Sequence, residues 1–230
     1  MTVRDAIGDM PRISHGANKD LIESNDDSLA LTQYQRVMQR GSEGLYYDHE
    51  CASLSALNEK RCELIPKKPG SDWRDLPNIA VTLRDGTVTV PHRYEHDDSS
   101  RIGRTIFRSD ATATKTNSLI PRCLAQKADG HNGWPNLYGR LDLDGYFLTI
   151  TTNPQPMGKT GRVVHPDQNR CISVRECARA QGFPDAFRFS GRLGDKYRQV
   201  GNAVPPPLAR AIGLEIKEAI LNKPRPSSTK

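Results

Sequence analysis

Residues 170–220 read RCISVRECARAQGFPDAFRFSGRLGDKYRQVGNAVPPPLARAIGLEIKEAI. Within this stretch, Ser173 precedes a helical run and Glu176 follows it by three residues. That spacing predicts a capping box, in which the hydroxyl and the carboxylate each accept a backbone N–H that the first helical turn leaves unpaired. Gly182 predicts the end of this helix, because glycine adopts the left-handed conformation of a helix C-terminus without steric cost.

Two further elements are predicted in the same stretch. A helical turn, DKYRQ, should end at Gly201, and residues 202–204 should run extended into three prolines. A last helix is predicted because apolar residues recur at helical spacing along one face, namely Leu208, Ala211, Ile212, Ile216, Ala219 and Ile220. Capping boxes and proline runs also occur in ordinary helices and linkers, so each element alone leaves a purely structural interpretation open.

The order of these elements carries more information than any one of them. The RECARAQGFP helix, the YRQVGNAVPPPLA turn and the apolar last helix resemble motifs IX and X of the DNA (cytosine-5) methyltransferases. The block at 67–94, KKPGSDWRDLPNIAVTLRDGTVTVPHRY, resembles the maintenance-type enzymes of animals within that family. The resemblance implies that the first helix braces a target-recognition region. It also implies that Asn202, Ala203 and Val204 touch the methyl donor, S-adenosyl-L-methionine.

Composition limits the possible classes of protein. The 230 residues are 36% hydrophobic and 26% charged, which suffices for one or two modest cores and is too polar for a membrane protein. The net charge of +6 is spread along the chain and indicates a polyanionic partner only weakly. The five cysteines show no CxxC spacing, which favours reduced thiols in the cytosol or nucleus.

The rest of the chain predicts mostly turns and short elements. Residues 1–11 predict a short helix closed by Pro11, and the TQYQRVMQR run within a loop-rich 12–44 could be helix or strand. Residues 46–65 predict a helix, and 79–90 predict a β-hairpin with a two-residue turn at Asp85-Gly86. Strands are expected at Leu141, Leu143 and 146–152, joined at Asp144-Gly145.

No metal site is predicted. His49 and Cys51 lie close together, but no second ligand pair follows at zinc spacing. Vertebrate maintenance enzymes carry three zinc-binding cysteines in the loop that resembles 95–118, and a histidine where this chain has Gln126. The loop contains no cysteine here, so the resemblance implies that the whole zinc site has been lost.

The resemblance assigns the reading of the parental 5-methylcytosine to apolar residues. A methyl group offers no hydrogen bond, so only shape and apolar area can recognise it. The residues that match are Cys123, Leu124, Trp134, Leu137 and Met157. An ordinary buried core is the alternative interpretation of the same residues.

Polar residues of this chain are also matched to DNA contacts. Lys159 matches a residue that reaches guanine or fills the space left by the flipped base, and Thr160 replaces a glutamine. Phosphate contacts are expected from Arg162, Arg175, Arg179 and Arg198, although surface arginines often only face solvent.

The groups that would perform the chemistry are absent from the sequence. The family takes its thiolate nucleophile from a Pro-Cys dipeptide, its acid from Glu-Asn-Val and its donor cradle from a Gly-rich turn. The chain contains no Pro-Cys, no Glu-Asn-Val and no G-x-G, so we expect no catalytic residue in it and no activity by itself.

The predicted fold class is therefore α/β, a fragment of a doubly wound S-adenosylmethionine-dependent methyltransferase with a loop-rich β target-recognition domain. Residues 1–11 and 162–222 should belong to the catalytic domain, 12–161 to the recognition domain and 223–230 to a disordered tail. The expected partners are double-stranded DNA with hemimethylated CpG and the N-terminal catalytic portion of the enzyme, in the nucleus and without a membrane. A non-enzymatic methyl-CpG-binding module and a scaffold that docks a partner protein remain alternatives.

Overall fold

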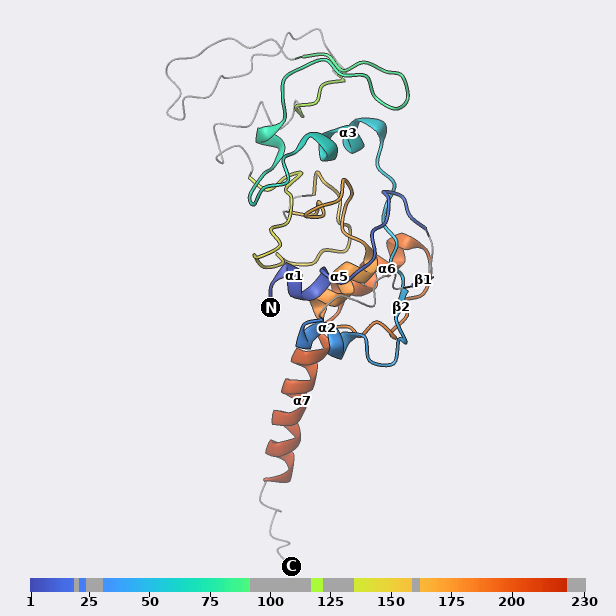
Figure 1. The fold of residues 1–230 in the computed structure, drawn as a ribbon. Coiled ribbons are helices and arrows are strands. Elements are labelled where there is room, and N and C mark those ends of the chain that lie inside the picture. The colour runs from blue at the N-terminus through green and yellow to red at the C-terminus, as the bar shows by residue number, and fades with distance from the viewer. Residues whose placement is uncertain (19–20, 24–30, 92–116, 122–134, 159–161, 223–230) are drawn as a thin grey trace, which may run out of the picture.

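The structure is a computed structural model that describes residues 1–18, 21–23, 31–91, 117–121, 135–158 and 162–222. Its elements in chain order are α1 (Val3–Ile7), β1 (Leu21–Glu23), α2 (Gln33–Met38), β2 (Leu45–Tyr47), α3 (Ala56–Leu64), the 3-10 helix η1 (Trp73–Asp75), α5 (Val174–Gln181), α6 (Leu193–Asn202) and α7 (Pro206–Leu221). Figure 1 shows α1, α2, α5 and α6 gathered in one body, with α3 to one side and α7 projecting away on the other.

Helix α5 is capped at both ends as its sequence predicts. The Ser173 hydroxyl accepts the Glu176 N–H at 3.1 Å, and the Glu176 carboxylate accepts the Ser173 N–H at 2.7 Å. Gly182 ends the helix in the left-handed conformation, with φ of 82°. These local interactions fix both ends of the helix to which several distant segments bind.

Helix α6 is longer than the sequence predicts. It continues through Gly201 and Asn202, so the expectation that Asn202 is extended is wrong. The extended part begins at Ala203, with φ of −75° and ψ of 143°, and leads through Val204 into Pro205. The residue before a proline avoids the helical conformation, which explains why the helix cannot continue further.

The strands form one two-stranded antiparallel sheet, in which Ile22 of β1 lies opposite Tyr46 of β2. The predicted hairpin at 79–90 is present as a single antiparallel bridge between Thr82 and Val88. Its turn differs from the prediction, because the Leu83 N–H bonds the Thr87 carbonyl and encloses three residues instead of two. Gly86 closes this loop with φ of 81°, a conformation that glycine permits.

The strands expected in 141–152 are not formed, and that prediction is wrong. The backbone groups of this segment bond to a helix instead of to a neighbouring strand. The first N–H groups of α1, from Val3 and Arg4, donate to the carbonyls of Gly145 and Leu143 at 2.9 and 2.8 Å. A helix N-terminus lacks internal partners for its first N–H groups, and the turn at 142–145 supplies the carbonyls that accept them.

The described residues bury two hydrophobic clusters. The first, which we call the lower core, joins α1, α5 and α6 to Tyr46, Leu141, Ile172, Phe183 and Phe189. The second, the upper core, joins Leu54 and α3 to Trp73, Leu76, Ile120, Leu137, Tyr138 and segment 163–171. The segment from Val163 to Ile172 contributes residues to both cores. The two cores are therefore joined by one continuous stretch of backbone.

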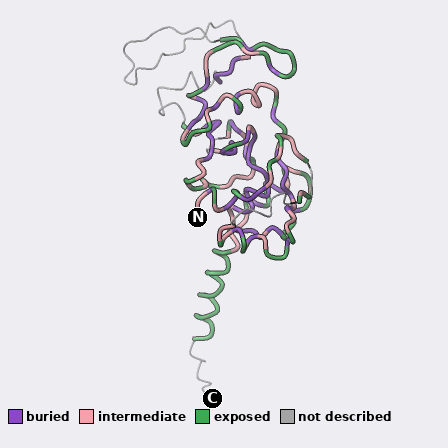
Figure 2. The backbone as a smooth tube through the Cα atoms, viewed as in Figure 1, coloured by how far each residue is buried: buried purple, intermediate pink, exposed green. Residues whose placement is uncertain are grey.

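Helix α7 contributes nothing to either core. None of its residues is buried, and Figure 2 shows it exposed along nearly its whole length. Leu208, Ile212, Ile216 and Ile220 are each between 48% and 65% exposed. No helix in the described part of the chain is long and apolar enough to cross a membrane.

Candidate functional site

The turn at 202–204 follows α6 and lies at the surface. Val204 is 59% exposed and Asn202 is also exposed, whereas Ala203 packs against the lower core. The Ala203 N–H donates to the Val200 carbonyl at 3.2 Å, and Gln181 of α5 donates to the same carbonyl at 3.1 Å. The turn therefore presents a polar amide and an apolar side chain at the surface.

A buried ion pair lies beneath the N-terminus of α5. Arg170 donates to both carboxylate oxygens of Glu176, at 2.8 and 2.7 Å, and neither side chain is exposed. Burial opposes ionisation of Glu176, but the charge and hydrogen bonds of Arg170 outweigh it and hold the pKa of Glu176 below its usual value. The ionised Glu176 can therefore serve as the cap of α5.

His165 lies beside this ion pair and stays neutral. Its Nδ1 accepts the backbone N–H groups of Asp167 and Gln168, both at 3.1 Å, and its Nε2 lies 3.4 Å from Glu176. Burial lowers the pKa of His165 to about 3, against the opposing pull of the Glu176 carboxylate. The imidazole therefore acts as a hydrogen-bond acceptor that shapes the loop before α5.

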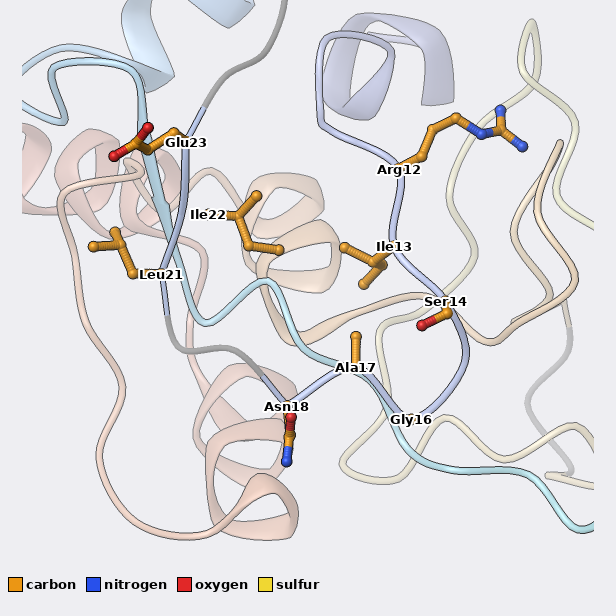
Figure 3. A pocket seen from close by; sticks show the side chains of 9 residues that line it. All are labelled: Arg12, Ile13, Ser14, Gly16, Ala17, Asn18, Leu21, Ile22 and Glu23. Carbon is orange, nitrogen blue, oxygen red and sulfur yellow. The ribbon is translucent and has the colours of Figure 1, made fainter.

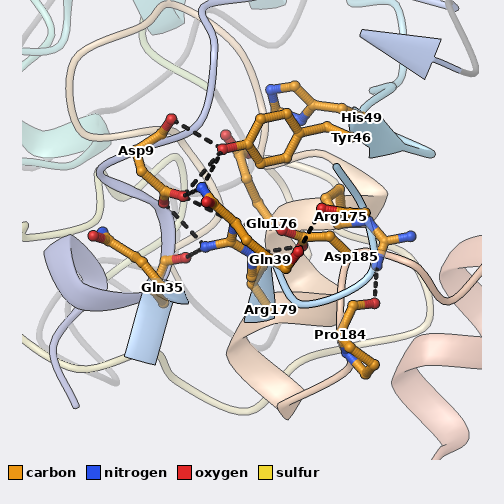
Figure 4. Close-up of polar contacts among 12 residues, drawn as sticks. Asp9, Gln35, Gln39, Tyr46, His49, Arg175, Glu176, Arg179, Pro184 and Asp185 are labelled. Carbon is orange, nitrogen blue, oxygen red and sulfur yellow. Dashed lines mark hydrogen bonds and ion pairs between the residues drawn. The ribbon is translucent and has the colours of Figure 1, made fainter. Parts of the chain in front are cut away.

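Arg179 joins α5 to the N-terminal end of the chain. Its guanidinium donates to both oxygens of Asp9, at 3.0 and 2.9 Å, and to both oxygens of Asp185, at 2.6 and 2.7 Å. It also donates to the Ala6 carbonyl at 2.9 Å, and Tyr46 donates to Asp9, as Figure 4 shows. One cation is thus shared by two buried carboxylates from segments far apart in the sequence.

Arg175 holds a second set of segments. It donates to the carbonyls of Tyr47 and Pro184 at 2.7 and 3.0 Å, to the Phe187 carbonyl, and to Asp48 at 3.3 Å. Both Arg175 and Arg179 have 0% of their surface exposed. The expectation that these two arginines contact DNA phosphates is therefore corrected, since no part of either side chain reaches solvent.

The other two arginines remain accessible. Arg162 is partly exposed and donates to the Asn136 side chain at 2.9 Å. Arg198 is 64% exposed and pairs with Asp195 on the surface of α6. Arg198 can turn toward a polyanion, because exposed ion pairs of this kind are weak.

The methyl-reading residues that the structure describes differ in their surroundings. Leu137 is buried in the upper core, whereas Met157 is 39% exposed. The two lie on connected backbone, because the Tyr138 N–H donates to the Pro156 carbonyl at 2.7 Å. Cys123, Leu124, Trp134, Lys159 and Thr160 lie outside the described residues, as do Gln126 and most of the loop at 95–118.

Sequence reasoning missed the residues that hold Leu137 in place. Leu137 lies between two residues with positive φ, Asn136 at 76° and Tyr138 at 53°. The Asp72 carboxylate accepts the Asn136 N–H at 3.0 Å, and the Trp73 N–H donates to the Leu137 carbonyl at 3.2 Å. The Asp-x-x-Asp spacing of η1 was the available signal, because it marks a capping box that here also holds a distant loop.

Arg140 was missed for a different reason. It is buried and donates to the carbonyls of Cys62 and Ile65, at 2.7 and 3.1 Å, and of His165 and Gln168, at 2.6 and 2.9 Å. These partners lie 25 to 78 residues away, so no local pattern reveals them. The side chain ties the end of α3 to the loop that leads to α5.

A cavity of about 660 Å³ lies between segment 12–18 and β1. Figure 3 shows Ile13, Ala17 and Ile22 facing its interior, with Arg12 and Glu23 directed away. None of the predicted site residues lines it. In the described part of the chain no group of three potential ligands could hold a metal ion, and Cys51, Cys62, Cys171 and Cys177 are buried free thiols.

The sequence profile of the C-5 cytosine-specific DNA methylases matches residues 34–218. The chain belongs to this family. The family takes its methyl group from S-adenosyl-L-methionine. The match includes α5, α6 and the turn at 202–204, so the resemblance inferred from motifs IX and X is confirmed.

Individual relatives agree with this assignment. DNA (cytosine-5)-methyltransferase 1 of Gallus gallus is 49% identical over 96% of this chain, and that of Mus musculus is 47% identical over 100%. DNA (cytosine-5)-methyltransferase PliMCI of Paracentrotus lividus is 47% identical over 97% of the chain. The chain spans only 14% to 15% of the length of these relatives.

Solved structures with a similar fold include a methyltransferase. It is a putative DNA modification methyltransferase encoded within an E. coli prophage, with a TM-score of 0.50 at 19% identity. The alignment covers 96% of this chain and 47% of that one. The mixed arrangement of helices and short strands is therefore one that a methyltransferase of this type adopts.

Proposed function

We propose that this chain is the DNA-recognition and donor-edge portion of a maintenance-type DNA (cytosine-5)-methyltransferase. Residues 12–161 form its target-recognition domain, and residues 1–11 and 162–222 complete a doubly wound catalytic domain whose main sheet comes from elsewhere in the enzyme. The chain reads hemimethylated CpG in double-stranded DNA, in the nucleus. By itself it transfers no methyl group.

The proposal rests on the position of α5, which contacts the predicted recognition domain through one side chain and the end of α6 through another. On the recognition side, Arg175 binds the Tyr47 carbonyl and the Asp48 carboxylate, both in residues 12–161. On the other side, Gln181 binds the end of α6, from which the turn at 202–204 emerges. A helix that binds both parts through buried polar contacts keeps a recognition surface and a donor surface in a fixed relation.

Asn202, Ala203 and Val204 hold one edge of S-adenosyl-L-methionine in this proposal. The bound donor supplies the methyl group, and the thiolate that attacks cytosine comes from the other portion of the enzyme. The chain's own residues therefore bind and orient. The exposed Asn202 amide offers both a donor and an acceptor, while Val204 offers apolar surface.

DNA recognition in this proposal divides into affinity and selectivity. Arg162 and Arg198 contact phosphates, and Lys159 and Thr160 lie near the flipped base. The parental methyl group is held by apolar residues, namely Cys123, Leu124, Trp134, Leu137 and Met157. Among these, the exposed Met157 can reach a ligand directly, whereas the buried Leu137 supports the surface from within.

The apolar face of α7 favours assembly with another surface. Leu208, Ile212, Ile216 and Ile220 expose a continuous apolar stripe that a lone chain would leave in water. The missing catalytic portion is the proposed occupant. The scaffold interpretation uses the same face, so the experiment must separate docking from catalysis.

The test is transfer of radiolabelled methyl groups to hemimethylated CpG DNA. We would assay this chain alone, the part of the mouse relative that precedes the matched residues alone, and the two mixed. Activity is expected only in the mixture. Activity in this chain alone, or a mixture that associates but stays inactive, would contradict the proposal, and the second outcome would favour a scaffold.

Binding of DNA by the chain alone tests the remaining alternative. A non-enzymatic methyl-CpG module would bind methylated duplex tightly without any partner and with a steep salt dependence. The proposed portion of an enzyme should gain most of its preference for hemimethylated DNA only after mixing. Gel-shift titrations at two salt concentrations, with and without the catalytic part, measure the difference.

A further inference from the structure

Gly201 lies in the last turn of α6 and touches the backbone of a distant segment. A Cβ added to Gly201 would lie 2.6 Å from Thr152 N, 2.7 Å from Thr151 C and 2.8 Å from Thr152 Cα. Side chains essentially never approach backbone atoms this closely. The three atoms are all main-chain atoms, so no rotamer change could relieve the contact.

Glycine is otherwise a poor choice at this position. Gly201 lies inside a helix and has no positive φ, so alanine would suit its backbone better. The benefit of glycine must therefore come from the close approach itself. An isolated glycine within a helical pattern often has such a packing reason.

The contact joins the two surfaces that the proposed function requires. Thr151 and Thr152 continue the segment that carries Met157, and Gly201 directly precedes the turn at 202–204. Ile150 and Ala203, on either side of the contact, both pack against the lower core. The recognition segment and the donor-edge turn thus meet backbone to backbone at Gly201.

A second glycine fixes the other end of the turn. A Cβ added to Gly182 would lie 2.7 Å from Pro207 Cγ and 2.8 Å from Pro207 Cδ. The turn at 202–204 is therefore held between Gly201, which contacts the recognition segment, and Pro207, which contacts the end of α5. The position of this turn relative to the recognition segment and to the end of α5 is therefore set by two close contacts, each of which requires a glycine.

We propose that Gly201 is a positioning residue, which sets the donor-edge turn against the recognition segment so that the two surfaces keep one relative geometry. This inference rests on the proposed function of the turn. It assigns Gly201 no contact with donor or DNA. Displacing the last turn of α6 from Thr151 and Thr152 should move the turn at 202–204 while leaving the methyl-reading residues, and Arg198 one helical turn earlier, where they are.

The variant is Gly201→Ala, and Gly194→Ala in the same helix is its control. Nothing lies within 4 Å of a Cβ at Gly194, so that substitution adds a methyl group without a contact. Hydrogen exchange on the 230-residue chain provides a readout without donor or DNA. Since the Ala203 N–H bonds the Val200 carbonyl, Gly201→Ala should speed exchange at Ala203 roughly tenfold or more, while Gly194→Ala leaves it unchanged.

The second readout is a steady-state assay of the mixed enzyme. Gly201→Ala should raise the KM for S-adenosyl-L-methionine about tenfold or more, since misplacement by about 1 Å can cost on the order of 10²-fold in rate. The KM for hemimethylated DNA should stay within about twofold of the starting value, because the DNA-reading residues remain in place. Gly194→Ala should change neither KM.

The outcomes separate this inference from the proposed function. If the unmodified mixture transfers no methyl group, the proposed function fails, and the exchange experiment still tests the Gly201 contact. If the mixture is active and Gly201→Ala lowers the melting temperature without raising the donor KM, Gly201 is merely structural and the inference is wrong. Equal increases in both KM values would overturn it as well.

Discussion

Arg179 and Asp185 face one another through two N–H···O bonds, of 2.6 and 2.7 Å, and neither side chain is exposed to solvent. The pair is bidentate, so it fixes the orientation of the guanidinium as well as its distance. The remaining N–H groups of the same guanidinium then point toward the Asp9 carboxylate and the Ala6 carbonyl, to which they donate. The hairpin-like turn after α5 and the end of α1 are thereby held by one residue.

Arg179→Met should be among the most destabilising substitutions in the chain. It would leave Asp9 and Asp185 buried without their cation, and breaking a buried pair in this way costs about 3–5 kcal/mol. Arg198→Ala is the control, because its partner Asp195 is 45% exposed and exposed pairs contribute about 0–1 kcal/mol. Urea unfolding followed by circular dichroism measures both. Similar losses for the two variants would contradict the expected difference.

Gly182→Ala should reduce the free energy of unfolding more than Gly86→Ala, although the two residues have nearly the same positive φ. The φ angles are 82° and 81°, so the left-handed strain on alanine is matched at about 1–2 kcal/mol. Only at Gly182 does the added methyl group also meet the Pro207 ring, whereas nothing lies within 4 Å at Gly86. The difference between the two free energies of unfolding therefore isolates the contact between α5 and α7. Equal losses in the free energy of unfolding for the two variants would mean that the Pro207 ring can move away from the added methyl group.

His165→Asn should make the free energy of unfolding depend less steeply on pH at acid pH. The pKa of His165 is about 3 in the folded chain, below the value of about 6.5 in the unfolded chain. The unfolded state therefore binds more protons between these pH values. Stability is complete above about pH 6.5 and falls as the pH is lowered toward 3.

The asparagine variant can still accept the N–H groups of Asp167 and Gln168 but cannot titrate. The slope of stability against pH should therefore decrease by up to about 1.4 kcal/mol per pH unit. Buried His49 also has a lowered pKa, so some slope should remain. Urea midpoints measured from pH 7 to 4 supply the comparison. Parallel curves for the variant and the unmodified chain would show that His165 contributes no proton linkage.

Trp134→Ala should weaken selectivity more than affinity. If an apolar wall reads the parental methyl group, its loss should reduce the preference for hemimethylated over unmethylated CpG. Arg162→Ala should instead weaken binding to both DNAs equally, because a phosphate contact carries no sequence information. Competition binding by the mixed enzyme distinguishes the two patterns. Equal losses on both DNAs for Trp134→Ala would remove this residue from methyl recognition.

The purified chain should contain well under one equivalent of zinc. The loop at 95–118 contains no cysteine, and Gln126 stands where the related enzymes have a histidine ligand. A zinc site forms only when its ligand set is complete. Elemental analysis after dialysis against buffer without chelator gives the answer, and a stoichiometric metal would contradict the prediction.

The sequence predicted those features whose partners are close along the chain. Ser173 and Glu176 are three residues apart, and Gly182 directly ends the same helix, so the ends of α5 follow from local chemistry. The close approach of Gly201 to the backbone of Thr151 and Thr152 could not be predicted, because those two residues lie about 50 residues earlier in the chain.

The dependence on distant partners also explains why the predicted phosphate contacts of Arg175 and Arg179 were wrong. Arg175 and Arg179 lie on a polar-looking helix, where surface exposure is the usual expectation. Their carboxylate partners Asp48 and Asp9 are 127 and 170 residues away, and although Asp185 lies only six residues from Arg179, that spacing across Gly182 and Pro184 is no helical pairing pattern that would mark a buried anchor. Family resemblance identified the motif, but the role of each charged side chain required the fold.

Helix α7 has a thermodynamic consequence of its own. None of its 16 residues is buried by the described part of the chain, so beyond the contact of Pro207 with Gly182 its helical order depends on its own backbone bonds and on the two prolines that stiffen its first turn. Helices of about this length are only marginally stable in water. Whatever surface covers α7 must also complete its ordering, and the entropy lost in that step reduces the affinity below what the buried area alone would give. Assembly through this helix should therefore weaken on warming, as the free helix loses its order.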